Sequence, residues 1–225
     1  MLRGIHVGLD KEEILRFSVP ISREQAEEFE RLAEFRSVPE FIENLEYSDI
    51  KLVLLTKLHV YEELNSTAPL EVAVESWYLK KILDSLESFS KDDQKRVLDI
   101  LEARVDLRNV LTIMRSLVLQ LEPRAVEMSL VRFTKRSNAL LRRIEKKNSW
   151  QEVLAQLETT RYSELASRIA RMYEDSQNLV QVELAIEDYI AQRVKLQLTA
   201  YPFHLGTVAG FFNLKYYQVR NVRSI

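Results

Sequence analysis

Apolar residues recur three and four positions apart along most of the chain, as they do on the buried face of a helix. In the segment LEVAVESWYLKKILDSL, which follows Pro69, this spacing joins Leu70, Val74 and Trp77. A second segment with this spacing runs from residue 92 to about residue 119 and predicts one long helix. No stretch alternates apolar and polar residues for long enough to predict a strand. The pattern therefore predicts an all-α protein.

Helix starts are marked by pairs of residues three positions apart. In such a capping box, the first side chain accepts a hydrogen bond from the helix backbone and the second reaches back to the capping residue. The whole chain has only four glycines and five prolines, which favours long helices over turn-rich structure. The capping pairs are Asp10–Glu13, Ser22–Gln25, Ser37–Glu40, Ser90–Asp93 and Ser149–Glu152.

The sequence repeats itself at an interval of 112 residues. The segment SVPEFIENLE at 37–46 corresponds to SWQEVLAQLE at 149–158, and LEVAVESWY at 70–78 corresponds to VELAIEDYI at 182–190. Colinear blocks at one offset, without a gap, indicate an internal duplication. We therefore predict three parts, which are the end of a preceding repeat at 1–36, one helical repeat at 37–148, and a C-terminally shortened repeat at 149–225.

Both ends of the chain fall at one position of this repeat. Residues 1 and 225 each correspond to Ile113, inside the long predicted helix. A helix cut at that point would leave backbone groups and an apolar face unsupported. We therefore expect about one further repeat upstream of Met1 and a short tail after Ile225.

A polar pair interrupts the apolar face of two predicted helices. In the first of them, Leu101 and Val105 share a stripe with Arg108. A buried guanidinium without a partner costs several kcal/mol, so we expect a carboxylate opposite. Otherwise the arginine would extend to solvent at the edge of the stripe. The two pairs, related by the repeat, are Arg108–Asn109 and Arg220–Asn221.

The repeat places carboxylates at corresponding positions for these arginines. We predict that Arg108 binds Glu75 and that each asparagine caps a neighbouring helix end or bonds its backbone, because it points about 100° away from the arginine. The same offset predicts that Arg220 binds Glu187. The alternative partners on the same two helices are Glu71 and Glu183.

The composition argues against nucleic acid as a partner, against thiolate metal sites and against membrane-spanning segments. Thirty-two basic residues against 34 acidic ones give a net charge of −2, so no basic excess exists to attract nucleic acid. The segment KRSNALLRRIEKK at 135–147 is interpreted as an amphipathic surface helix. The absence of cysteine excludes disulfides and thiolate metal sites. Apolar runs such as LVLL at 52–55 are too short to cross a bilayer, so any membrane role would be peripheral.

No group of residues has the spacing of a catalytic site. The three histidines, His6, His59 and His204, lie far apart without metal-ligand spacing. The acidic pair at 92–93 lacks the further acids that a magnesium-dependent prenyl-transfer enzyme needs. GTVAG at 206–210 lacks the lysine and the length of a phosphate loop, and its small residues favour a close approach of two helices. The sequence therefore predicts no catalytic residue, metal, cofactor or small-molecule substrate.

The closing segment AYPFHLGTVAGFFNLKYYQVRNVRSI, residues 200–225, resembles the family of C and d subunits of archaeal- and vacuolar-type rotary ATPases. ARVDLRNVLTIMRS is similar to the family's Asp-Leu-Arg-Asn segment one repeat earlier, and LRGIHVGLDKEEIL is similar to the segment after its first such helix. The resemblance spans nearly the whole chain. Members of the family typically have three repeats, whereas this chain has two. One departure is that Tyr216 and Tyr217 stand where the family often has acids. The matching positions are Tyr201-Pro202, Gly206, Phe212, Leu214-Lys215 and Arg220-Asn221-Val222.

The resemblance implies a pseudo-symmetric, funnel-like, all-α subunit without catalysis and without a cofactor. Such a subunit lies on the cytoplasmic end of the membrane rotor ring and receives the foot of the central stalk. It passes torque between them in a proton- or sodium-translocating ATPase. Its partners would be ring and stalk subunits, and it would be peripheral to the membrane without inserting into it. The alternatives are a helical-repeat scaffold for other partners and a helical enzyme.

Overall fold

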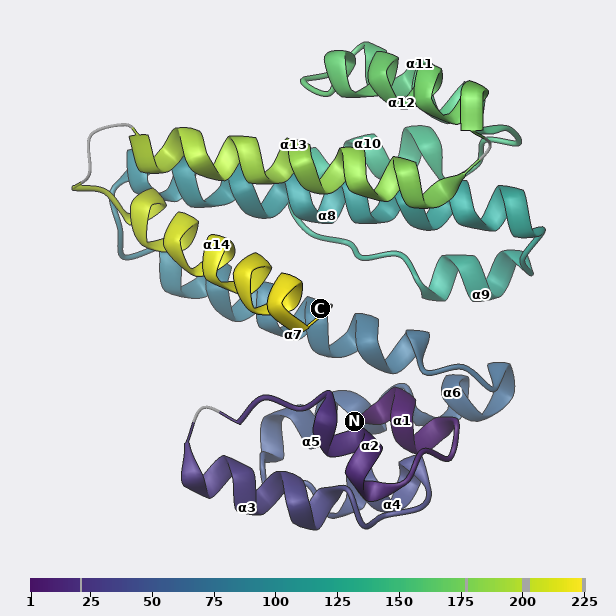
Figure 1. Ribbon diagram of the computed structural model, residues 1–225, viewed down its shortest axis with the longest axis vertical. Coiled ribbons are helices and arrows are strands. Elements are labelled where there is room, and N and C mark those ends of the chain that lie inside the picture. The colour runs from purple at the N-terminus through teal and green to yellow at the C-terminus, as the bar shows by residue number, and fades with distance from the viewer. Residues whose placement is uncertain (21, 177, 200–202, 224–225) are drawn as a thin grey trace. The chain divides into compact units, whose positions relative to one another are not determined.

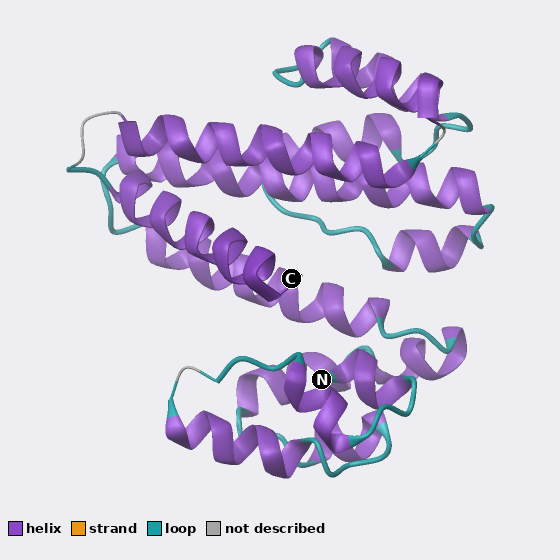
Figure 2. Cartoon of the chain, viewed as in Figure 1, coloured by secondary structure: helices purple, strands orange, loops and turns teal. Residues whose placement is uncertain are grey.

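The computed structural model describes residues 1–20, 22–176, 178–199 and 203–223, except for the side chains at 175, 176, 199, 216, 217 and 219–223. The described residues form helices and loops and contain no strand (Figure 2), which confirms the all-α prediction. Packing divides the chain into two units, Met1–Tyr78 and Leu79–Ile225. The units are defined by packing and the repeats by sequence, so the predicted repeat boundaries stay a prediction.

The first unit is made mostly of short helices (Figure 1), three of which begin at the predicted caps Asp10, Ser22 and Ser37. At Asp10 the capping box is complete, because its carboxylate accepts from the Glu13 backbone N–H at 2.8 Å and its own N–H donates to Glu13 at 3.3 Å. Ser22 and Ser37 accept from the backbone three residues on. The helices are α1 (Leu2–His6), α2 (Lys11–Arg16), α3 (Arg23–Leu32), α4 (Val38–Glu43), α5 (Ser48–Leu55), α6 (Leu58–Leu64) and α7 (Ala68–Leu86), which continues into the second unit.

The second unit is organised around α8 (Lys91–Leu119), the long helix that the sequence predicts. Ser90 caps its start by accepting from the Asp93 backbone N–H at 3.1 Å. Leu107, Val110 and Met114 of this helix are fully buried in a core shared with the four helices that follow α9. The other helices are α9 (Pro123–Met128), α10 (Lys135–Ile144), α11 (Trp150–Glu158), α12 (Ser163–Ser176), α13 (Leu179–Thr199) and α14 (Leu205–Arg223).

Two local interpretations of the sequence hold in this unit. Ser149 caps α11 by accepting from the Glu152 backbone N–H at 3.3 Å. The basic segment at 135–147 forms α10, which buries Leu141 and Ile144 in the core and turns its basic side chains outward. It is therefore the amphipathic surface helix that was expected.

Candidate functional site

Asn109 holds the chain segment between α9 and α10. Its amide Nδ2 donates to the carbonyl oxygen of Val131 at 2.7 Å, and its Oδ1 accepts from the backbone N–H of the same residue at 2.9 Å. Both residues are buried, with 2% and 0% of their surface exposed. Asn109 therefore bonds the backbone of a loop, and not that of a neighbouring helix as predicted, and the bonds satisfy two backbone groups that have no helix to pair with.

Arg108 contacts the same segment. Its Nη1 donates to the carbonyl oxygen of Ser129 at 3.2 Å, so the Arg-Asn pair binds two carbonyls of one loop. The predicted partner Glu75 belongs to the other packed unit, and the side chain of Arg220 lies outside the described residues. Both carboxylate pairings, of Arg108 with Glu75 and of Arg220 with Glu187, therefore stay predictions.

The two alternative carboxylates form ion pairs with other arginines. Glu71 of α7 accepts from the Arg3 guanidinium through both of its oxygens, with Arg3 Nε 2.6 Å from Oε1. Arg115 of α8 donates through Nη2 to Glu183 Oε2 of α13 at 2.5 Å. Arg115 stands 112 residues after Arg3, and Glu183 stands 112 after Glu71. The same interaction thus recurs at the same offset, which is what a duplication leads one to expect.

Gly206 lies where α14 comes close to α8. A Cβ atom there would be 3.0 Å from Cβ of Arg96, so a larger residue would push the helices apart. A Cβ atom at Gly210, one turn later, would be 3.3 Å from Cδ2 of Leu198 of α13. The interpretation of GTVAG as a close contact between helices is confirmed by these distances.

The other predicted positions of the closing segment are described only in part. Lys215 is exposed on α14, with Nζ 2.9 Å from Oε1 of Gln218. Asn221 lies on α14, but its side chain is outside the described residues, as are Tyr201 and Pro202 entirely. Any role of these four positions stays a prediction.

A buried ionic cluster on α8 was not predicted from the sequence. Asp99, Glu102 and Asp106 lie on one face of α8, and all three contact the guanidinium of Arg161, at 3.1, 3.4 and 3.4 Å. The Arg161 side chain is only 13% exposed, and those of Glu102 and Asp106 are 8% and 4% exposed. The signal that would have revealed the cluster is the spacing of the acids at i, i+3 and i+7 in the middle of a core helix.

Neutral groups complete this cluster. The hydroxyl of Tyr162 donates to Asp106 Oδ2 at 2.6 Å, and that of Thr134 donates to Glu102 Oε1 at 2.6 Å. Burial, and next the charge of Asp106, raises the pKa of the Tyr162 hydroxyl well above its ordinary value. Tyr162 therefore stays a hydrogen-bond donor at any physiological pH.

The cluster is suited to holding helices together rather than to chemistry. Its three carboxylates are partly neutralised by the two guanidinium groups of Arg161 and of Arg136, whose Nη1 lies 3.5 Å from Glu102. Within the described ranges, no three His, Asp or Glu side chains are grouped as metal ligands. A buried, hydrogen-bonded ion cluster of this kind fixes one arrangement of the helices that contribute to it.

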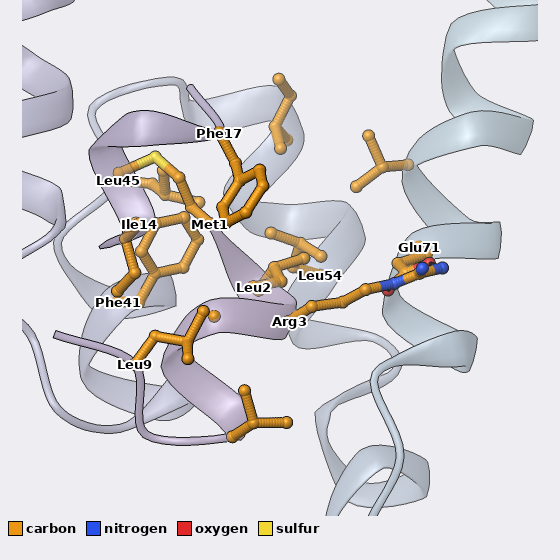
Figure 3. Close-up of a pocket in the computed structure, with 14 residues that line it drawn as sticks. Met1, Leu2, Arg3, Leu9, Ile14, Phe17, Phe41, Leu45, Leu54 and Glu71 are labelled. Atoms are coloured by element: carbon orange, nitrogen blue, oxygen red, sulfur yellow. Dashed lines mark hydrogen bonds and ion pairs between the residues drawn. The ribbon is translucent and has the colours of Figure 1, made fainter. Parts of the chain in front are cut away.

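The first unit contains an apolar hollow of about 610 Å³ between α1, α2, α4, α5 and α7. Figure 3 shows Arg3 at its edge, extending from α1 toward Glu71 of α7. Phe17, which follows α2, also lines the hollow and has 74% of its surface exposed. We call it the α1–α7 hollow, and its lining includes Leu2, Leu9, Ile14, Phe41, Leu54 and Val74.

Among the described residues, none of the helices combines the length and the apolarity that crossing a bilayer requires.

Comparison with known proteins identifies the family. The C subunit of the A-type ATP synthase of Methanocaldococcus jannaschii is 22% identical over 227 residues, covering 100% of this chain and 56% of the relative. The protein of the same name from Methanothermobacter thermautotrophicus is 26% identical over 219 residues, covering 97% and 57%. That of Haloferax volcanii is 21% identical over 228 residues, covering 100% and 64%.

The chain thus spans less than two thirds of the length of these relatives. No solved structure matches it. The family described as ATP synthase (C/AC39) subunit matches residues 1–225, which is the whole chain. This match agrees with the resemblance of the closing segment, and the chain belongs to the ATP synthase (C/AC39) subunit family.

Proposed function

We propose that the protein is a non-catalytic central-stalk subunit of a V/A-type rotary ATPase, where it couples the membrane rotor ring to the central stalk. The observation that carries this proposal is the family match over residues 1–225, together with relatives that are named as the C subunits of A-type ATP synthases. Its partners are then the ring and stalk subunits of a proton- or sodium-translocating complex. It is held at the cytoplasmic face of the membrane by those proteins.

The polar contacts between helices support a mechanical role. A subunit that transmits torque must resist sliding of its helices, and apolar contacts alone are not directional. Arg3 and Glu71 form a two-point contact between α1 and α7, and Arg115 and Glu183 join α8 to α13. Such charge-assisted bonds have a fixed geometry, so they resist a shift along the helix axis.

The buried cluster supports the same role. Arg161 lies in the turn between α11 and α12, and its guanidinium binds three carboxylates of α8. Its backbone carbonyl also accepts from the Tyr189 hydroxyl of α13 at 3.1 Å. One residue therefore joins three helical segments, which suits a rigid part better than a binding site that must open.

Co-purification from the native membrane tests the proposal. A tagged copy of the protein is expressed in its own host, membranes are solubilised in mild detergent, and the captured proteins are identified by mass. We expect the rotor-ring subunit and the stalk subunits of a rotary ATPase, in fixed ratio to the bait. The control is the same tag on an unrelated helical protein. Recovery of a different, reproducible set of partners would instead support a helical-repeat scaffold.

Membrane association provides an independent test. We expect the purified protein to sediment with vesicles that contain the rotor ring and to stay in the supernatant with vesicles of lipid alone, because recruitment is through protein contacts. Equal binding to both kinds of vesicle would contradict the proposed mode of attachment.

A further inference from the structure

A hollow of about 280 Å³ lies beside the buried ionic cluster of the second unit. It is formed by α8, α10 and the turn between α11 and α12, and all of its lining residues fall between positions 106 and 162, inside one packed unit. We call it the arginine hollow. Its polar lining residues are Asp106, Arg136, Arg143, Thr160, Arg161 and Tyr162.

The charges that line the arginine hollow favour an anion. The lining contains three guanidinium groups and a single carboxylate, that of Asp106. The other two acids of the ionic cluster, Asp99 and Glu102, are not among the lining residues. A cation in the hollow would be repelled by the arginines, whereas an oxyanion would be attracted by them.

Two of the three arginines have hydrogen-bond donors left for a ligand. Arg136 forms ion pairs with two carboxylates of α8, at 3.5 and 3.7 Å, but donates no hydrogen bond within the part of the chain that the structure describes. Arg143 donates from Nε and Nη2 to Gln156 and Thr159, which are neutral, and its Nη1 has no acceptor among the described residues. Arg136 and Arg143 are both exposed, so a ligand reaches them from solvent without the movement of a helix.

The internal duplication does not account for this set of arginines. Two of them have acidic counterparts 112 residues earlier, which are Glu24 and Asp49. The third, Arg143, corresponds to Arg31, whose Nη2 pairs with Oε1 of Glu46 at 3.1 Å. The three arginines at one hollow are therefore particular to the second unit, and a general requirement of the repeat does not explain them.

Asp106 provides a hydrogen-bond acceptor in this hollow. Its Oδ2 accepts from the Tyr162 hydroxyl at 2.6 Å and from Nη2 of Arg161 at 3.4 Å. Its Oδ1 is buried and has no hydrogen-bond donor within the described ranges, and the side chain is only 4% exposed. A buried carboxylate oxygen without a donor is unfavourable, so a ligand that carries a hydroxyl group would be stabilised there.

The chemistry of the ligand follows from these two requirements. The ligand must carry negative oxygens for the guanidinium groups and a hydroxyl for Oδ1 of Asp106. A phosphate group meets both near pH 6, where a phosphate monoester is about half protonated, and guanidinium groups bind its oxygens through charge-assisted hydrogen bonds. A sulfate ion or an ionised carboxylate has no hydroxyl, so either would place an oxygen lone pair against that of Asp106.

We propose that the arginine hollow binds a protonated phosphate group, with Arg136 and Arg143 donating to its charged oxygens and Asp106 Oδ1 accepting from its hydroxyl. The group belongs to inorganic phosphate or to a small phosphate monoester, because a hollow of this volume lies near the lower end of ligand pockets, which span about 300–1,000 Å³. The site is built from residues of one unit and does not depend on the proposed rotor function.

Equilibrium dialysis of the full chain against radiolabelled ligands at pH 6 tests the proposal. The ligands are inorganic phosphate, glycerol phosphate and sulfate, at equal ionic strength in a buffer that contains no other oxyanion. We expect phosphate to bind, and sulfate to bind at least about tenfold more weakly, because it leaves Oδ1 without a donor. Sulfate carries the larger negative charge at this pH, so attraction by charge alone would give the opposite order. Tighter binding of inorganic phosphate or of glycerol phosphate identifies the source of the group.

Two variants test the roles of individual residues. Arg143→Gln should weaken phosphate binding at least about tenfold, whereas Arg142→Gln, at the neighbouring exposed position outside the hollow, should leave it unchanged. Asp106→Asn should abolish the preference for phosphate over sulfate. Its amide oxygen stays with the donors Tyr162 and Arg161, so the amide nitrogen takes the place of Oδ1 and donates to either anion.

Asp99→Asn is the matched control for Asp106→Asn. It removes one carboxylate charge from the same cluster at a position that does not line the hollow, so it should keep the preference for phosphate. Circular dichroism melts show which variants fold. Should Asp106→Asn fail to fold, the selectivity of the wild-type chain and the effect of Arg143→Gln, at an exposed position, still decide the proposal.

Three results would overturn the proposal. The first is a wild-type chain that binds neither phosphate ligand at millimolar concentration. The second is sulfate binding as tight as that of phosphate, which would exclude an acceptor for a ligand hydroxyl. The third is phosphate binding that Arg143→Gln leaves unchanged, or a preference for phosphate that Asp99→Asn abolishes as well.

Discussion

Asp93 of α8 accepts a hydrogen bond from the backbone N–H of Leu205, with 2.7 Å between Oδ1 and N. Leu205 is the first residue of α14, so Asp93 binds one of the N–H groups that this helix start leaves without a partner. The two residues stand 112 positions apart. The starts of two corresponding helices therefore lie side by side, joined by one carboxylate.

This contact predicts a pH dependence of stability. The hydrogen bond from Leu205, and next that from Ser90, lowers the pKa of Asp93. A carboxylate whose pKa is lower in the folded state stabilises the fold above its unfolded pKa, and this contribution is lost as the pH falls through the folded value. The unfolded pKa is about 3.9. We expect Asp93→Asn to lower the melting temperature at pH 7.

The difference between wild type and Asp93→Asn should shrink as the pH is lowered from about 5 to below 3, because the wild-type carboxylate then becomes protonated. Thermal melts across this range measure it. The exposed Asp84→Asn serves as the control. A difference of constant size at every pH would show that the charge of Asp93 contributes nothing.

The clamp made by Asn109 leads to a second prediction. Asn109→Ala removes two hydrogen bonds and leaves the N–H and C=O of Val131 buried without partners. Since an unsatisfied buried polar group costs about 1–3 kcal/mol, we expect a loss of about 2–4 kcal/mol in the free energy of unfolding. Urea denaturation measures it. The exposed Asn44→Ala should change the free energy of unfolding by less than about 1 kcal/mol, and an equally small loss at Asn109 would contradict the clamp.

Local features of this fold could be predicted from the sequence because they depend on neighbouring residues. The caps at Asp10 and Ser90 and the extent of α8 follow from residues a few positions apart. The backbone contact of Asn109 could be anticipated in kind, because a buried amide must bond something. The identity of its partner Val131, 22 residues later in the chain, could not be predicted from the sequence.

The pairing of charges was harder to predict for a physical reason. Glu71 and Glu183 were offered as alternative partners of Arg108 and Arg220, but they bind Arg3 and Arg115, each of which lies on the corresponding helix one repeat earlier in the chain. Helical periodicity specifies a face, whereas the packing of helices decides which helices meet. Arg161 lies in a turn, so no periodicity pointed to it.

The ion pair of Arg115 and Glu183 should contribute little to stability by itself. Their side chains are 45% and 40% exposed, and ion pairs of that exposure contribute about 0.2–1 kcal/mol. A double-mutant cycle with Arg115→Ala and Glu183→Ala should therefore give a coupling energy of about 0.5 kcal/mol, reduced further at 1 M salt. A coupling above about 2 kcal/mol would mean that the pair is shielded from water.

Arg161 should behave in the opposite way, although it also forms ion pairs. Its side chain is 13% exposed, and it is in contact with three carboxylates of α8. Removing one partner of a buried ion cluster leaves uncompensated charge, which costs about 3–5 kcal/mol. We therefore expect Arg161→Ala to lower the free energy of unfolding by about that amount.

The loss at Arg161 should depend on the acids that it neutralises. If Glu102 and Asp106 are replaced by Gln and Asn together with Arg161→Ala, no buried charge is left at those two positions, so much of the stability should return. Urea denaturation of the single and triple variants measures the difference. The exposed Arg142→Ala on α10 is the control. If the triple variant were as unstable as Arg161→Ala alone, the loss would come from the packing of the arginine stem rather than from unpaired charge.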